Sequence, residues 1–201
     1  MAQEKRGKDR RIQKTQALLH EALGSLIREK PYDEIVLKEI LDRANVGRST
    51  FYTHFRDKDE LLASSIQQML SIFQSTDVPA SGKKDERIIR FSLPVFEHIH
   101  GHRQAGAGGM GSRGRALMHE HLKNVLAEHI ALDIGKVLQG RRRAMGQIPL
   151  ELLVHYVAST FVLVLDWWVE SNSALGPKEV NDLFRALAVP TLTSCLDLCG
   201  K

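Results

Sequence analysis

Two groups of residues have the types that bind metals or carry out redox chemistry. Histidines alternate with other residues at His98, His100 and His102, and Cys195 and Cys199 are one helical turn apart. On a helix, residues i and i+2 do not share a face, so the histidines can hold one ion only if that segment is extended. The cysteine spacing fits a shared metal or a redox pair, and it equally fits ordinary residues of a terminal helix. We therefore assign no metal and no cofactor, and we leave a metal or redox role of both groups open.

Residue patterns typical of catalysis are not found in the sequence. We find no Ser/His/Asp set, no phosphate-binding glycine loop and no paired-carboxylate motif. An enzyme hypothesis therefore has no chemistry to rest on, and we predict that the chain is not an enzyme.

A third group, the segment RSTFYTH at residues 48–54, has the residue types that recognise DNA. Arg48 can pair bidentately with guanine, a contact that provides about 1–3 kcal/mol of discrimination. Ser49, Thr50 and Thr53 carry short donors and acceptors for phosphates or bases. We therefore predict that this segment forms a DNA-recognition element.

The residue pattern of positions 36–62 predicts the helices that hold this segment in place. Asn45 and Gly47 form a break whose residue types tolerate tight or left-handed backbone. Apolar residues recur at helical spacing on both sides of it, at Ile40, Leu41, Ala44, Val46, Phe51, Phe55, Leu61 and Leu62. This is the pattern of a helix-turn-helix, whose second helix, here residues 48–54, contacts the major groove of DNA. Phe51 and Phe55 are expected in its core.

At these residues the sequence resembles the TetR/AcrR family of transcriptional regulators. The TFYTHF core followed by Lys58 is specific to that family. Three positions depart from the family pattern: Val36 replaces a capping Thr, Asn45 replaces the turn Gly, and Gly47 replaces the Ser that caps the recognition helix. The matching positions are Ile40, Ala44, Val46, Thr50, Phe51, Tyr52, His54, Phe55, Lys58 and Leu61.

The resemblance implies further DNA contacts. Tyr52 and His54 are expected to donate to the DNA backbone, and Lys58 to hold a phosphate from the start of the following helix. Lys38, on the first motif helix, is a further candidate, expected either at a phosphate or on a solvated face.

Charge is concentrated at the N-terminus. The chain of 201 residues carries a net charge of +4, with a pI of about 9.1, and the first fourteen residues alone hold six basic and two acidic side chains. Such an arm suits contact with phosphates or an adjacent groove, or else it is a solvated tail. Two cysteines, no apolar N-terminal segment and no uncharged membrane-length run lead us to expect a cytoplasmic protein without membrane contact.

The fold class is predicted to be all-α. Helices are expected near residues 9–29, 57–73, 84–100 (kinked or split at Pro94), 112–138, 148–171 and 177–199 (bent at Pro190), with a glycine-rich loop at 101–114. We expect an N-terminal three-helix helix-turn-helix DNA-binding domain with its basic arm over residues 1–56. A C-terminal helical ligand-binding and dimerisation domain is expected over residues 57–201.

One helix-turn-helix covers only half of a DNA site, so a second copy is required. Two units about 34–36 Å apart match one turn of DNA and a near-palindromic operator. The helices at 148–171 and 177–199 are the expected homodimer interface, since the first is more apolar than a monomer requires and the family resemblance assigns both helices that role.

The resemblance also implies an effector pocket among the middle helices. The residue types of its candidate lining suggest a mostly apolar small molecule with one polar handle. Each of these residues also fits an ordinary place in the protein core. The candidates are Met69, Phe73, Phe91, Phe96, His121, Tyr156 and Trp167. The leading hypothesis is a homodimeric repressor released by a small-molecule effector. The alternative is a DNA-binding regulator whose C-terminal domain responds to a protein partner. The operator, the effector and the choice between repression and activation are not set by the sequence.

Overall fold

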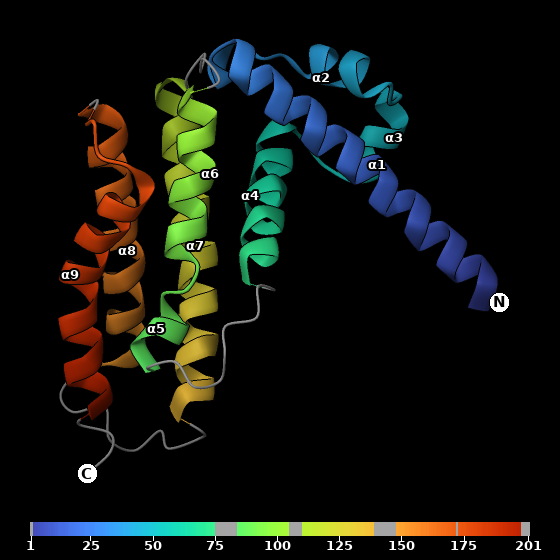
Figure 1. The fold of residues 1–201 in the computed structure, drawn as a ribbon. Helices are drawn as coiled ribbons and strands as arrows, with labels where there is room; N and C mark the ends of the chain where they lie inside the picture. Colours follow the sequence, from blue (N-terminus) through green and yellow to red (C-terminus); the bar gives the residue numbers. More distant parts are fainter. Residues whose placement is uncertain (1, 75–83, 105–109, 139–147, 172, 198–201) are drawn as a thin grey trace. The chain divides into compact units, whose positions relative to one another are not determined.

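The computed structural model describes residues 2–74, 84–104, 110–138, 148–171 and 173–197. Within these ranges every regular element is a helix, as predicted, and no strand occurs (Figure 1). The elements are α1 (Ala2–Glu29), the 3-10 turn η1 (Tyr32–Glu34), α2 (Leu37–Ala44), α3 (Arg48–Tyr52), α4 (Lys58–Gln74), α5 (Lys84–Ile88), α6 (Ser92–Gln104), α7 (Gly111–Leu138), α8 (Leu150–Glu170) and α9 (Pro177–Asp197).

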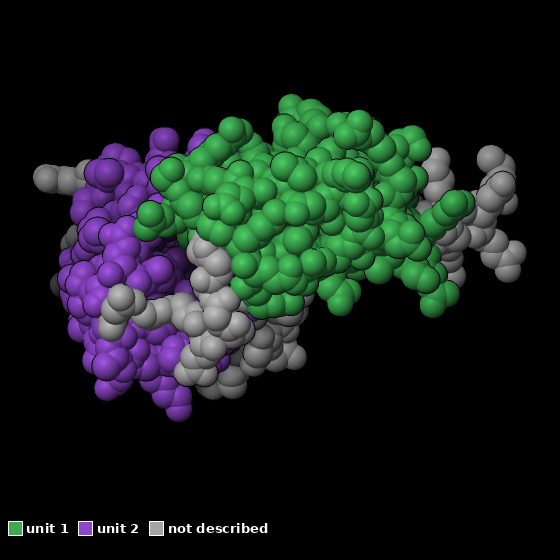
Figure 2. All heavy atoms as spheres, turned by 90° about the horizontal axis from the view of Figure 1, so that it is seen from above, with its two compact units in different colours: residues 1–66, 102–118 green, residues 67–101, 119–201 purple. Residues whose placement is uncertain are grey.

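The chain divides into two compact units, coloured separately in Figure 2. Unit 1 comprises residues 1–66 and 102–118, and unit 2 comprises residues 67–101 and 119–201. This division differs from the predicted boundary after residue 56. The first part of α4 and the first two turns of α7 belong to unit 1 because their contacts lie there.

Unit 1 is built on α1, whose buried residues share one face. Leu19, Ala22, Leu23 and Leu26 follow the 3–4 residue spacing of an amphipathic helix and are all buried. This face packs on α2. From the motif and the start of α4, the core includes Ile40, Leu41, Ala44, Phe51, Phe55, Leu61 and Leu62.

The ends of α1 differ in how well the sequence predicts them. The helix ends at Glu29, two residues before Pro31, because the residue preceding a proline is driven out of the α region. Its start lies at Ala2 rather than near residue 9, so the basic arm belongs to a helix. The first buried residue among the described side chains of α1 is Leu19, and Arg10, Arg11 and Lys14 are exposed.

Unit 2 has an aromatic core built from α6, α8 and α9 and from Phe91, which directly precedes α6. Phe161 of α8 lies 4.8 Å from Phe96 and 5.3 Å from Phe184, centroid to centroid. Phe91 and Trp168 complete this fully enclosed cluster. α8 and α9 pack along each other (Figure 1).

Two middle segments differ from their predicted form. The helix expected at 84–100 is split into α5 and α6, but the break precedes Pro94, which lies in the first turn of α6, where proline is tolerated. Ser92 begins α6, and its hydroxyl donates to Asn181 Oδ1 at 2.6 Å in the core. Part of the segment predicted as a glycine-rich loop at 101–114 is helical, because α6 continues to Gln104 and α7 begins at Gly111; residues 105–109 lie outside the described residues.

One helix, Leu150–Glu170, has the length and apolar composition of a membrane span. About half of its most apolar window, 56%, is buried inside the protein. A core helix passes the same test, and the aromatic cluster gives α8 that role here.

Candidate nucleic-acid interface

The turn between α2 and α3 depends on a left-handed residue. Asn45 has φ 50° and ψ 46°, and it is the only non-glycine residue with positive φ in the described ranges. Asn tolerates this region better than most residues. The following amide of Val46 donates to Leu41 O at 3.1 Å. The sequence-based reading of Asn45 as the turn residue is confirmed.

The recognition helix α3 is short and has an exposed face. It spans Arg48–Tyr52 rather than residues 48–54 and has no side-chain cap at Gly47. Phe51 is fully buried and Tyr52 is 54% exposed, so the two neighbours point to opposite sides. The predicted contact residues Lys38, Arg48, Ser49, Thr50, Tyr52 and Thr53 are all exposed, and His54 is half-buried. Phe51 and Phe55 are core residues, as predicted.

Thr53 is the C-cap of α3, and its hydroxyl proton is used in a hydrogen bond within the protein. Its hydroxyl donates to Thr50 O at 2.6 Å, and its amide donates to the same carbonyl at 3.2 Å. A hydroxyl has one proton to donate and two lone pairs to accept with. Toward DNA, Thr53 Oγ1 therefore offers an acceptor in this conformation.

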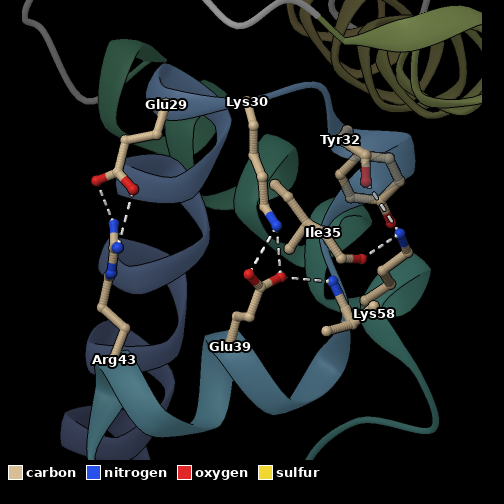
Figure 3. A network of polar contacts seen from close by, with 8 residues as sticks. Glu29, Lys30, Tyr32, Ile35, Glu39, Arg43 and Lys58 are labelled. Carbon is tan, nitrogen blue, oxygen red and sulfur yellow. Dashed lines mark hydrogen bonds and ion pairs between the residues drawn. The ribbon is translucent and has the colours of Figure 1, made fainter.

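Two ion pairs fix α2 against the end of α1 (Figure 3). Arg43 holds Glu29 in a fork, with N–O distances of 2.5 and 2.9 Å. Lys30 donates to both carboxylate oxygens of Glu39, at 2.6 and 2.7 Å. The hydrogen bonds from Arg43 and Lys30 lower the pKa values of Glu29 and Glu39. These pairs orient the motif more than they stabilise it, since both are largely solvated.

Glu39 also supplies the cap that the sequence seemed to lack. Its carboxylate accepts from the amide of Val36 at 3.0 Å (Figure 3). This is half of a capping box, in which the third helical residue reaches back to the N-cap amide. Sequence reasoning missed it, although a Glu three residues after the helix start is the signal.

Lys58, which is predicted to hold a phosphate, also makes contacts within the protein. Its Nζ donates to Tyr32 O at 2.9 Å and Ile35 O at 2.7 Å (Figure 3), and it lies 4.4 Å from the Tyr32 ring centroid. Partial burial lowers the pKa of the ammonium group. Two of its three donors are thus used within the protein, because α4 begins directly beneath η1. Any phosphate contact is limited to the third.

The motif and the helices around it are similar to those of known proteins. The family model described as "Bacterial regulatory proteins, tetR family" matches residues 19–64, which cover the buried face of α1, the helix-turn-helix and the start of α4. Residues 19–64 of the chain are therefore similar to bacterial regulatory proteins of the tetR family.

The similarity of the chain to a longer curated protein is distant. It is 22% identical over 174 residues to an uncharacterized HTH-type transcriptional regulator, YxbF, of Bacillus subtilis. That match covers 83% of this chain but only 42% of the relative's length, so the chain spans less than half of that protein.

Two solved structures share the fold. A TetR transcriptional regulator from Streptococcus agalactiae gives a TM-score of 0.55 at 21% identity, over 90% of this chain and 97% of the other. A tetR-family regulator from Streptomyces coelicolor gives a TM-score of 0.55 at 18% identity, over 92% and 85% of the two chains. The fold that this chain shares with the two structures therefore extends beyond residues 19–64.

The residues predicted for an effector pocket do not form one described group. Phe91 and Phe96 belong to the aromatic core of unit 2. Tyr156 and Trp167 lie on an exposed face of α8, where the Tyr156 hydroxyl donates to Leu187 O at 3.0 Å. Met69 and His121 are half-buried, and the side chain of Phe73 lies outside the described residues.

Only part of the histidine group and part of the cysteine group lie among the described residues. His100 stacks on Trp168 at 5.9 Å, Cys195 is buried, and the side chain of His102 and all of Cys199 lie outside the described residues. Among the side chains that the structure describes, no group of three or more His, Cys, Asp or Glu residues is placed to hold a metal.

An exposed apolar stripe follows α8 and α9. Its residues on α8 repeat at helical spacing, with Leu152 60% and Leu163 65% exposed. The complete stripe is Leu152, Tyr156, Leu163, Trp167, Leu183 and Leu187. A face of this composition is typical of an interaction surface.

Proposed function

We propose that the chain binds a near-palindromic DNA operator as a homodimer and represses transcription until a small-molecule effector releases it. The observation that carries the DNA-binding part is the exposed row of Arg48, Ser49, Thr50 and Tyr52 on a helix anchored by the buried Phe51. This arrangement presents one polar face of α3 while its other face is fixed in the core. A regulator of this kind acts where the chromosome is, so we place it in the cytoplasm.

The proposed contacts divide into two kinds. Arg48 is exposed, its guanidinium can pair with the O6 and N7 atoms of a guanine, and it is the candidate for base recognition. Lys38, Tyr52 and His54 are the candidates for phosphate contacts, which set position and affinity but not sequence. Ser49 and Thr50 can meet either, whereas the free acceptor of Thr53 can meet only a base donor, because a phosphate oxygen has no proton to donate.

The basic start of α1 extends the proposed DNA contact. Helix α1 begins at Ala2, well before Leu19, which is its first buried residue among the described side chains. Arg10, Arg11 and Lys14 lie in this N-terminal extension and are exposed. Exposed cationic side chains on such a helix gain by neutralising phosphates. We expect the extension to raise affinity for all duplexes and to steepen its salt dependence.

The apolar stripe on α8 and α9 supports the proposed homodimer. Burying Leu152, Leu163 and Leu187 against a second copy would remove large apolar surfaces from water. An isologous contact of this kind places two copies of α3 about a two-fold axis, as a palindromic operator requires.

The effector is proposed to bind within unit 2. Met69 and His121 both lie in unit 2 and are half-buried, and their side chains are of the types that offer an apolar surface and a polar handle. A ligand that favours one of two conformations of the dimer shifts operator affinity by its differential affinity for them.

The test is selection of DNA from a random duplex pool by the purified chain, followed by affinity measurements with Arg48→Ala. Arg28→Ala, which removes another exposed arginine, on α1, is the matched control. We expect a two-fold-symmetric consensus, and only Arg48→Ala should relax its base preference. Addition of small-molecule pools then tests release; relief only by a protein partner would favour the alternative regulator.

A further inference from the structure

The first turn of α7 docks on the turn that precedes the helix-turn-helix. The amides of Arg113 and Gly114 donate to the two carboxylate oxygens of Asp33, at 3.2 and 2.9 Å. The first amides of a helix have no partner within it, and a carboxylate suits the positive end of the helix dipole. Asp33 of η1 therefore caps a helix that begins almost eighty residues later in the chain.

Two glycines make this approach possible. Gly111 has φ +65°, and a Cβ atom there would overlap the carboxyl group of Asp33. A Cβ atom on Gly114 would lie 2.9 Å from Cδ1 and 3.0 Å from Cβ of Tyr32. By contrast, Gly135 later in the same helix has no atom within 4 Å of such a Cβ. The close packing is therefore local to the first turn of α7.

A second set of contacts closes the same interface. Arg113 pairs with Asp59 Oδ2 at 2.9 Å, and the hydroxyl of the fully buried Tyr32 donates to Asp59 Oδ1 at 2.5 Å. Burial alone would raise the pKa of Asp59, but the hydrogen bonds from Tyr32 and Arg113 outweigh it and lower that pKa. We call Tyr32, Asp33, Asp59, Gly111, Arg113 and Gly114 the α7 seat.

The α7 seat is connected directly to the start of the DNA-binding motif. Lys58 donates to Tyr32 O and Ile35 O, and α2 begins at Leu37, two residues after Ile35. The amide of Val36 is held in turn by Glu39. Movement of the first turn of α7 would therefore disturb the backbone that sets the position of α2 and, through Asn45, of α3.

We propose that Asp33 and the first turn of α7 position the helix-turn-helix for DNA, and that the seated arrangement is the one that binds the operator. Asp33 is a positioning residue: it contacts α7 and not DNA. The inference rests on the proposed DNA-binding function, since it concerns how the same recognition helix is held. The contacts that position the helix-turn-helix then lie within unit 1, between residues 32–59 and 111–114.

Charge and positioning predict opposite effects for one substitution. Removing the negative charge of Asp33 alone would strengthen binding to the DNA polyanion. Removing the carboxylate that accepts from two amides of α7 loosens the α7 seat, so a smaller fraction of the molecules holds the helix-turn-helix in the arrangement that binds DNA. The apparent affinity for DNA falls in proportion to that fraction. The neighbouring Glu34, also exposed in η1, carries the same charge and accepts neither of these amides, so it is the matched control.

The experiment measures operator affinity of the full-length chain by fluorescence anisotropy, using the duplex selected by the wild type. We expect Asp33→Ala to weaken binding about tenfold, as a fall of the competent fraction to about a tenth requires. Glu34→Ala should bind equally well or more tightly. Asp33→Asn, which loses the charge but keeps one amide acceptor, should fall between Asp33→Ala and the wild type. Gly114→Ala should weaken binding, and Gly135→Ala should not.

A measurement on the wild type avoids variants that fail to fold. Because coupling is reciprocal, operator DNA should slow hydrogen exchange of the Arg113 and Gly114 amides and leave that of Gly135 unchanged. The positioning role would be overturned if Asp33→Ala and Glu34→Ala bound the operator equally well. It would also be overturned if hydrogen exchange of the Gly114 amide were the same with and without DNA. Failure of the wild type to select any duplex would instead overturn the proposed function.

Discussion

Replacement of Lys58 with Met separates a structural role from a DNA contact. Met keeps most of the aliphatic length of the side chain but removes the ammonium group that donates to Tyr32 O and Ile35 O at 2.9 and 2.7 Å. Hydrogen bonds from a charged donor contribute about 1.5–3 kcal/mol each. Lys58 is only partly buried, so water replaces some of the loss, and the nearby aromatic face adds about 0.5–1 kcal/mol.

We therefore expect Lys58→Met to lower the free energy of unfolding by about 2–3 kcal/mol. For a chain of this size that corresponds to a fall in melting temperature of roughly 5–10 °C, measured by calorimetry. Amide exchange in α2 should quicken as well, because the carbonyls that precede α2 lose their donor. Lys38→Met is the matched control, since Lys38 is an exposed lysine of α2.

Salt dependence of operator binding completes the comparison. Each phosphate contact contributes about 0.9 to the slope of log affinity against log salt. Lys38→Met should lower that slope by about one contact and leave stability unchanged, whereas Lys58→Met should lower stability and leave the slope unchanged. Unchanged stability together with a reduced slope for Lys58→Met would refute the structural role and restore the phosphate contact implied by family resemblance.

Three further predictions follow from the packing and charge of the two units. Leu163→Lys should convert a dimer into a folded monomer in light-scattering measurements, while Leu132→Lys, at a similarly exposed leucine of α7, should not; a dimer in both would move the interface elsewhere. Phe51→Ala empties a fully buried site and should cost about 3–5 kcal/mol of unfolding free energy, measured by urea denaturation; a loss below about 1 kcal/mol would contradict the anchoring of α3. The pKa of Asp59 in the folded chain is below its ordinary value of 3.8, so the unfolded chain binds that proton first as the pH falls. The free energy of unfolding should therefore decline from about pH 3.8 down through the native pKa of Asp59. Asp59→Asn should lack this decline in acid titrations, and a pH profile identical to that of the wild type would contradict the hydrogen bonds assigned to Asp59.

Local sequence signals predicted the motif because its structure is set by local rules. Proline ends α1, Asn45 occupies the left-handed turn, and the spacing of Phe51 and Phe55 places both in the core. Each of these depends on residues a few positions apart. The same is true of the all-helical fold, whose apolar periodicity is visible along the chain.

Contacts between distant segments were not predictable in this way. Gly111 and Gly114 looked like loop glycines, and only the fold brings them against Asp33 and Tyr32. Lys58 was assigned to phosphate by family resemblance because its carbonyl partners are more than twenty residues away. Glu39 is the exception: its capping of Val36 follows a local rule that could have been applied.

The central claim is that α3 of two copies recognises DNA, and the most direct test is a titration of the selected duplex with the wild type and with Arg48→Ala. We expect two chains per duplex, loss of affinity when either half-site is scrambled, and an Arg48→Ala protein that binds the selected and scrambled duplexes more nearly alike. Binding of a single chain, or a preference for the selected duplex that survives Arg48→Ala unchanged, would contradict it.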